Sequence, residues 1–166
     1  VGVGMSPQGD YVLLSSCEKL GLVKLDLNSG NKQTLTDALG AGYGAVISPD
    51  GGKVLFYDNT FDHNHLRHVA VKSVDVATGA QKELVKPSRD VRGLTISGNA
   101  AEVMAGGKMQ VMGVDGGAAA EKRAVVSIRN RQLVLAADGK ETLLSPNGSD
   151  KSYLWPSLSS DGSKLL

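Results

Sequence analysis

The segment Ile47–Asp58, which reads ISPDGGKVLFYD, predicts the end of one β-strand, a tight turn and a second strand. Pro49 fixes φ at about −65°, which suits the first central position of a turn, and Asp50 can hydrogen-bond to the backbone just ahead of it. Gly51 or Gly52 can adopt a positive φ without a Cβ clash. The apolar run VLFY that follows has no polar interruption, so we expect a strand that is covered on both faces.

This turn-and-strand pattern recurs along the chain. Its copies begin at Ser6, Ser48, Ser97 and Ser159, and each precedes an apolar segment. A second pattern, consisting of a strand, a glycine turn and another strand, occupies Leu25–Thr36, Val74–Val85 and Leu135–Leu144. One period therefore contains four short strands, and four antiparallel strands per roughly 40–50 residues are typical of a β-propeller blade. The sequence predicts an all-β fold with about three blades and the start of a fourth.

The repeated residues also resemble a known family. Ser48–Gly51 with its apolar strand, followed by Asp75, Thr78, Gly79 and Leu84, is similar to the TolB-type propeller repeat, a relative of the WD-repeat blade. The resemblance covers nearly the whole chain. It implies a periplasmic or cell-envelope location, whereas the envelope partners of TolB do not transfer to this chain, because fold does not fix function.

Individual copies depart from the TolB-type pattern while the period persists. The departures are Gln8, the Gly98–Ala100 replacement and Ser160 in place of proline. Because propellers usually close with about 4–8 blades, we expect this chain to be part of a larger propeller of six to eight blades. The remaining blades or a second chain would be needed to close it.

The expected blades have unequal lengths. We assign blade one to 1–36, blade two to 43–85, blade three to 91–145 and the start of blade four to 153–166. Blade three is irregular, because additional strand-like segments follow its first strands. Either it carries an inserted hairpin or two blades are compressed here, and we favour the insertion.

Composition and motifs narrow the classes of function. The formal net charge is +1 without a long basic run, so nucleic acid is not an expected partner. No apolar run approaches the roughly 18 residues of a membrane helix. The sequence contains no GxSxG elbow and no HExxH motif, so we predict no catalytic residue and no cofactor.

The favoured function is therefore a non-enzymatic module that binds a protein, a peptide or another ligand. The alternative is a propeller domain attached to a prolyl oligopeptidase-like hydrolase, or to another enzyme whose catalytic part is not in this chain. A propeller enzyme with its site in the channel, such as a lyase or glycosidase, would need several inward acidic residues or a metal.

Propeller topology predicts where a partner would bind. The loops between the second and third strands of each blade, and those between blades, emerge on one face around the channel, whereas the repeated turns lie on the other. Loops on a rigid scaffold commonly carry binding residues. The predicted site on the channel face comprises Tyr43, Asp58, Asp62, His65, Arg89, Asp90, Arg92 and Tyr153.

All three histidines of the chain fall within the polar segment Asp58–His68, which we expect to be a long loop. His63 and His65 are two residues apart, so on an extended segment they would point the same way and could ligate zinc or copper, completed by Asp62 or His68. No Cys or Glu cluster supports such a site. We therefore favour a solvated polar loop and predict no metal.

Overall fold

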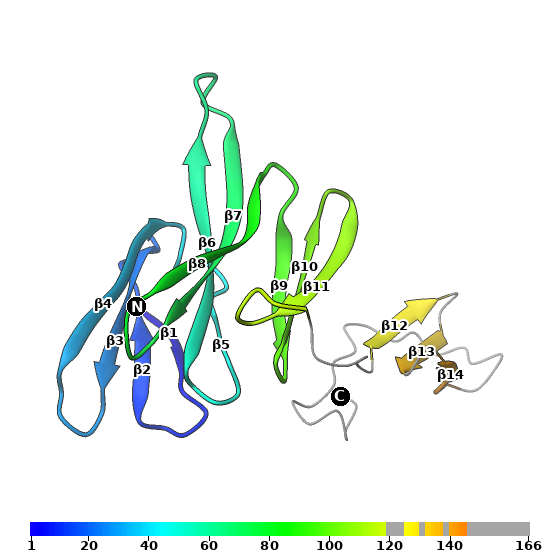
Figure 1. Cartoon of the computed structure of the whole chain (residues 1–166), viewed down its shortest axis with the longest axis horizontal. Helices are drawn as coiled ribbons and strands as arrows, with labels where there is room; N and C mark the ends of the chain where they lie inside the picture. The colour runs from blue at the N-terminus through cyan, green and yellow to red at the C-terminus, as the bar shows by residue number, and fades with distance from the viewer. Residues whose placement is uncertain (119–124, 130–131, 138–139, 146–166) are drawn as a thin grey trace. The chain divides into compact units, whose positions relative to one another are not determined.

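The computed structural model describes residues 1–118, 125–129, 132–137 and 140–145. The chain divides into two compact units, Val1–Ala119 and Ala120–Leu166, which are described separately below. Every regular element in the described residues is a strand (Figure 1). None of the described segments forms a helix able to cross a membrane.

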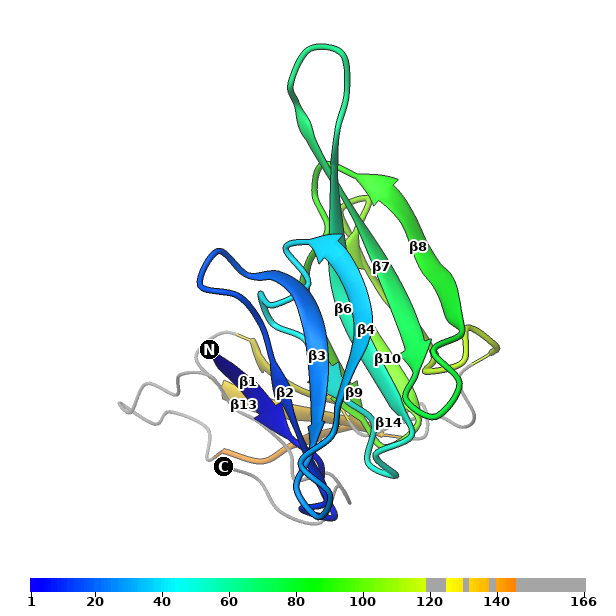
Figure 2. The ribbon, with the colours of Figure 1, turned by 90° about the vertical axis from the view of Figure 1, so that its left-hand side faces the viewer.

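The first unit begins with two four-stranded antiparallel sheets. The first sheet contains, in order, β1 (Gly2–Met5), β2 (Tyr11–Leu14), β3 (Leu20–Asp26) and β4 (Lys32–Leu39). The second sheet contains, in order, β5 (Val46–Ile47), β6 (Lys53–Phe61), β7 (Arg67–Asp75) and β8 (Gln81–Ser88). Figure 2 shows the two sheets side by side. These sheets confirm the prediction of an all-β fold built from blades of four antiparallel strands.

Two three-stranded sheets follow, one in each unit. The first unit ends with a third sheet of β9 (Arg92–Ser97), β10 (Ala100–Ala105) and β11 (Lys108–Gly113), in which β10 is central. The second unit contains β12 (Val125–Arg129), β13 (Gln132–Ala137) and β14 (Lys140–Leu143). β12 and β13 pair as an antiparallel hairpin, and β14 adds a third strand to this sheet. The division of 91–145 between blades stays a prediction, and 153–166 lies outside the described residues.

The apolar run of β6 packs into two different cores. Val54 and Phe56 belong to a cluster shared with the first sheet, whereas Leu55 belongs to a cluster shared with the third sheet. All three side chains are completely buried. Successive side chains of a strand point to opposite faces, so an uninterrupted apolar run is what a strand between two neighbouring sheets requires. The prediction that this strand is covered on both faces is confirmed.

The Ser-Pro-Asp-Gly turn is held by its own side chains. The Ser48 hydroxyl donates to Asp50 Oδ1 at 2.5 Å and accepts the Lys53 amide at 2.8 Å. The Gly51 amide donates to the Ser48 carbonyl at 2.8 Å, and Gly51 adopts a φ of 71°. These residues close the turn between β5 and β6, so their recurrence along the chain reflects backbone geometry.

The turns between the third and fourth strands also repeat the same contacts. Asp75 Oδ1 accepts the backbone amide and the hydroxyl of Thr78, both at 2.9 Å. Asp26 Oδ1 accepts the same pair of groups from Ser29, at 2.8 and 2.9 Å. Gly79 then takes a φ of 74°, which a residue with a Cβ would adopt only with strain. The carboxylates of Asp26 and Asp75 are thus engaged by residues of their own turns.

Candidate functional site

The segment between β6 and β7 is a β-hairpin arm, so the prediction of a long polar loop over Asp58–His68 is wrong. β6 continues to Phe61 and β7 begins at Arg67, and the ladder pairs Thr60 with His68 and Phe61 with Arg67. The arm projects beyond the neighbouring strands of its sheet (Figure 1). Thr and Phe favour strands, and the register set by the buried part of the ladder carries on through the polar residues.

A short turn closes the arm. Asp62 Oδ1 accepts the amides of Asn64 at 2.9 Å and Leu66 at 3.0 Å, while Asp62 Oδ2 lies 3.2 Å from His68 Nε2. The hydrogen bond from the Leu66 amide is the main reason that the pKa of Asp62 is lowered. His65 takes a φ of 58°, a left-handed conformation uncommon for residues other than glycine. Asp62 and His65 therefore help to shape the turn.

Strand alternation divides the arm's side chains between two faces. Tyr57, Asn59 and Phe61 share one face of β6, and their ladder partners place Val69 and Arg67 on the same face of β7. Asp58 belongs to the opposite face, where its carboxylate pairs with Lys72 Nζ at 2.6 Å. The face that carries Arg67 continues the face of Leu55, which packs against the third sheet.

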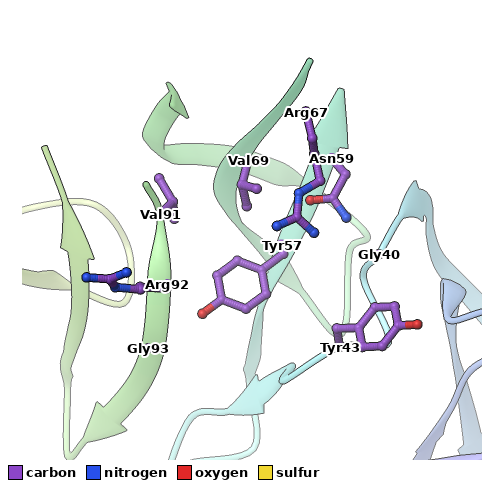
Figure 3. A pocket seen from close by; sticks show the side chains of 9 residues that line it. All are labelled: Gly40, Tyr43, Tyr57, Asn59, Arg67, Val69, Val91, Arg92 and Gly93. Carbon is purple, nitrogen blue, oxygen red and sulfur yellow. The ribbon is translucent and has the colours of Figure 1, made fainter. Parts of the chain in front are cut away.

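A pocket of about 350 Å³ lies on this face, where the arm meets the β4–β5 and β8–β9 connections. Its lining residues are Gly40, Tyr43, Tyr57, Asn59, Arg67, Val69, Val91, Arg92 and Gly93 (Figure 3). The side chains are those of two valines, two tyrosines, two arginines and one asparagine. The pocket thus combines apolar surface with hydrogen-bond donors and positive charge, a composition that suits recognition of a polar ligand.

The pocket's side chains differ in how they face its interior. The guanidinium of Arg67 points from β7 toward the rings of Tyr57 and Tyr43, and Asn59 lies beside it (Figure 3). The guanidinium of Arg92 extends away from these rings (Figure 3). Val69 and Val91 are only 4% and 8% exposed, so they form an apolar surface beneath the polar groups. Arg67 is therefore the cation best placed for a ligand inside the pocket.

Two contacts fix the walls of the pocket. The Leu94 amide donates to the Tyr57 hydroxyl at 2.7 Å, which ties the Tyr57 ring to β9. The Asn59 amide nitrogen packs against Gly40, where a Cβ would overlap it. Gly40 also has a φ of 85°, so both the space and the backbone conformation favour glycine there. These contacts hold Tyr57 and Asn59 in place without a ligand.

The carboxylates near the pocket are engaged elsewhere. Asp90 accepts the Ser88 hydroxyl at 2.6 Å and the Gly107 amide at 2.7 Å. Together with the Gly106 backbone these hydrogen bonds, that of Ser88 first, lower the pKa of Asp90 to about 2. The pairing of Asp58 with Lys72 and the turn contacts of Asp62 are described above. The residues that line the pocket include no acidic side chain, so the pocket carries a net positive charge.

The structure brings together part of the predicted site. Tyr43 and Arg92 line the pocket, whereas Asp58, Asp62, His65, Arg89 and Asp90 do not. Tyr153 lies outside the described residues. Asn59 and Arg67 line the pocket and were missing from the predicted site, although the alternation from Tyr57 to Phe61 was a signal for their placement. Binding of a partner by the predicted residues stays a prediction.

The histidines occupy different parts of the arm. His63 and His65 lie in the closing turn, which is not extended, and His68 belongs to β7. Within the described ranges, no group of three or more His, Cys, Asp and Glu side chains could hold a metal ion.

No family model and no curated protein matches this chain. Solved structures do match, and they define the class of fold. An oligogalacturonate lyase in complex with manganese gives a TM-score of 0.67 at 14% identity, over 97% of this chain and 56% of that one. The β-propeller domain of the Trilobed protease from Pyrococcus furiosus gives 0.54 at 13% identity, over 81% and 52%. The class is therefore the β-propeller.

A further match makes the type of propeller more specific. TolB from Acinetobacter baumannii gives a TM-score of 0.53 at 19% identity, over 99% of this chain and 47% of that one. The chain accordingly has a TolB-like β-propeller fold, as the repeat residues indicated. It spans about half the length of these solved structures. At these identities the likeness concerns the fold alone.

Proposed function

We propose that this chain is a non-enzymatic binding module that engages a protein or peptide through the face that carries the pocket. The observation that supports this proposal is the convergence of three separate segments on one pocket: the β4–β5 connection, the β6–β7 arm and the start of β9. Tyrosine and arginine are enriched among the residues that dominate binding energy, and the pocket has two of each.

The two ends of the first unit differ in how their polar groups are used. The turns β1–β2, β3–β4 and β5–β6 lie at one end, and the arm and the β8–β9 connection lie at the other (Figure 1). In the β5–β6, β3–β4 and β7–β8 turns, the side chains of Ser48, Asp26 and Asp75 form hydrogen bonds with neighbouring turn residues. At the pocket, Tyr43 is 60% exposed and Arg67 and Arg92 are exposed as well. The pocket end therefore offers Tyr43, Arg67 and Arg92 to a partner.

The second proposal is a propeller domain of an enzyme, such as a prolyl oligopeptidase-like hydrolase whose catalytic part is not in this chain. It is supported by the match to an acylaminoacyl peptidase from Pyrococcus horikoshii, with a TM-score of 0.53 at 13% identity over 82% of this chain. The resemblance to TolB supports a periplasmic or cell-envelope location, and this too is a proposal.

Site-specific photocrosslinking tests the binding face. A photoreactive phenylalanine analogue replaces Tyr43 at the pocket end, and the same analogue replaces Asn28 or Lys32 at the turn end as matched controls. We expect a partner to crosslink from position 43 and not from positions 28 and 32. Equal crosslinking from both ends, or crosslinking from the turn end alone, would contradict the proposed face.

A further inference from the structure

Arg67 carries an unneutralised positive charge into the pocket. Three lysines of this unit have contacts of their own: Lys53 pairs with Asp75, Lys72 pairs with Asp58, and Lys82 donates to the Asp115 carbonyl. Among the described residues the Arg67 side chain makes no ion pair and no hydrogen bond. A guanidinium has five N–H donors in a planar fork, so an anion that reaches this pocket would meet donors not used by the protein.

The geometry points to a carboxylate of a peptide as the group that Arg67 binds, and we propose this as the recognition element of the pocket. The inference rests on the proposed binding function and specifies the chemical group that the pocket would recognise. Arginine matches a carboxylate with two parallel N–H···O bonds, and such charge-assisted pairs are stronger than neutral hydrogen bonds. The buried Val69 and Val91 add apolar surface beneath the site.

Asn59 supports a peptide as the source of this carboxylate. Its amide nitrogen is directed at Gly40, and its oxygen faces the side of Arg67 (Figure 3). The oxygen can therefore accept a hydrogen bond close to the point where Arg67 would hold an anion. A peptide's C-terminal residue, or an aspartate or glutamate, carries both a carboxylate and a nearby backbone N–H. Arg67 and Asn59 together suit this combination better than a simple anion.

The β9 strand offers a second feature that suits a peptide. In the third sheet β9 is the terminal strand, so its outer edge forms no ladder within that sheet. Gly93 lines the pocket from this strand, and a Cβ there would meet nothing within 4 Å. The Leu94 amide is already used by Tyr57, and Gly93 lies beside it, where the β9–β10 ladder is irregular. Pairing of a peptide with an exposed strand edge is a common recognition mode.

The rings of Tyr43 and Tyr57 would flank the bound residue. Tyr57 is fixed by its contact with β9, whereas Tyr43 is exposed, so it can adjust to the ligand. Ordering a tyrosine side chain restricts few rotatable bonds, so its contact with a ligand costs little conformational entropy. In this arrangement Arg67 would bind the anion, Asn59 would accept the N–H hydrogen bond and the two rings would supply the apolar contacts.

The test titrates the full chain with small probes and follows the side-chain Nε–Hε resonance of Arg67 by NMR. The probes are N-acetyl-L-glutamate, its neutral isostere N-acetyl-L-glutamine amide, glucuronate as a carboxylated sugar, and inorganic phosphate. We expect N-acetyl-L-glutamate to bind about tenfold more tightly than the neutral isostere, as the loss of a charged hydrogen-bonding partner predicts. It should also bind more tightly than glucuronate and phosphate.

Variants identify the residue responsible. Arg67→Gln should remove the preference for N-acetyl-L-glutamate, Arg67→Lys should keep only part of it, and Arg89→Gln, an equal change of charge outside the pocket, should leave it unchanged. Binding to these variants is read from the backbone amide of Gly93. Equal binding of the charged and neutral probes, an equal loss in Arg89→Gln, or tighter binding of glucuronate or phosphate would each overturn the inference.

The two proposals can fail separately. A partner that crosslinks at position 43 and binds Arg67→Gln as tightly as the parent chain would overturn the carboxylate assignment and leave the binding face intact. A partner that crosslinks only from the turn end would contradict the proposed face, whatever the small probes show.

Discussion

Replacing Tyr57 by phenylalanine tests how the pocket is held together. The Tyr57 hydroxyl accepts the Leu94 amide at 2.7 Å and so joins the second sheet to the third. Leu94 is only 7% exposed, so water has limited access to its amide once the hydroxyl is gone. Phenylalanine keeps the ring that walls the pocket and removes the acceptor alone.

The expected cost follows from this geometry. A buried amide left without an acceptor costs about 1–3 kcal/mol, and a neutral hydrogen bond contributes a net of about 0.5–1.5 kcal/mol. Because Tyr57 is half-buried, some water can approach, so we expect the free energy of unfolding to fall by about 1–2 kcal/mol. Tyr43→Phe is the matched control, since Tyr43 is exposed and should change stability by less than about 0.5 kcal/mol.

Urea denaturation measures the difference in stability, and amide hydrogen exchange locates it. In Tyr57→Phe the Leu94 amide should lose protection more than the amides of β6 and β7. A Tyr57→Phe protein whose stability equals that of Tyr43→Phe, with Leu94 still protected, would refute the reasoning. It would show that the hydroxyl contact does not hold the third sheet against the second.

Three further predictions concern the rest of the first unit. Leu55→Ala should lower the free energy of unfolding by about 2–5 kcal/mol, because Leu55 is fully buried between two sheets, while Leu20→Ala at an exposed position should change it little in the same denaturation assay. Gly79→Ala should destabilise by about 1–2 kcal/mol from the positive φ alone, since a Cβ there meets no atom within 4 Å, and an unchanged melting curve would contradict this. The folded pKa of Asp90 is about 2, below the value of about 4 in an unfolded chain, so its contribution to stability is present above pH 4 and is lost as the pH falls toward 2. Asp90→Asn should therefore melt below the parent at pH 6, and the gap should shrink between pH 4 and pH 2.

The blade repeat could be inferred from sequence because its signals are local. The contacts of Ser48 within its turn, and those of Asp75 with Thr78, involve residues a few positions apart. Such turns depend on residue type and spacing, which the sequence displays directly. The burial of β6 on both faces could also be predicted from the sequence, because an apolar run without alternation requires neighbouring structure on each side.

The hairpin arm could not be predicted from local sequence, because its strand pairing depends on tertiary structure. The residues of Asp58–His68 are polar, and asparagine and aspartate are depleted in strands, so their composition indicated a loop. The ladder nevertheless extends to Phe61 and Arg67, because the register is set deeper in the sheet and Asp62 closes the turn. Where pairing ends is decided by the neighbouring strand, which local composition does not describe.

The sequence by itself determined the repeat and its turns, and it predicted the end of the blades at which binding residues would gather. Tertiary structure decided which of those residues share a pocket. Asp58 and Asn59 are adjacent in the chain, yet alternation directs one to Lys72 and the other to Arg67. The approach of β9 to the arm then adds Arg92 and Gly93 from a segment remote in sequence. A pocket between sheets arises from long-range packing, and that packing is not encoded in the spacing of any single motif.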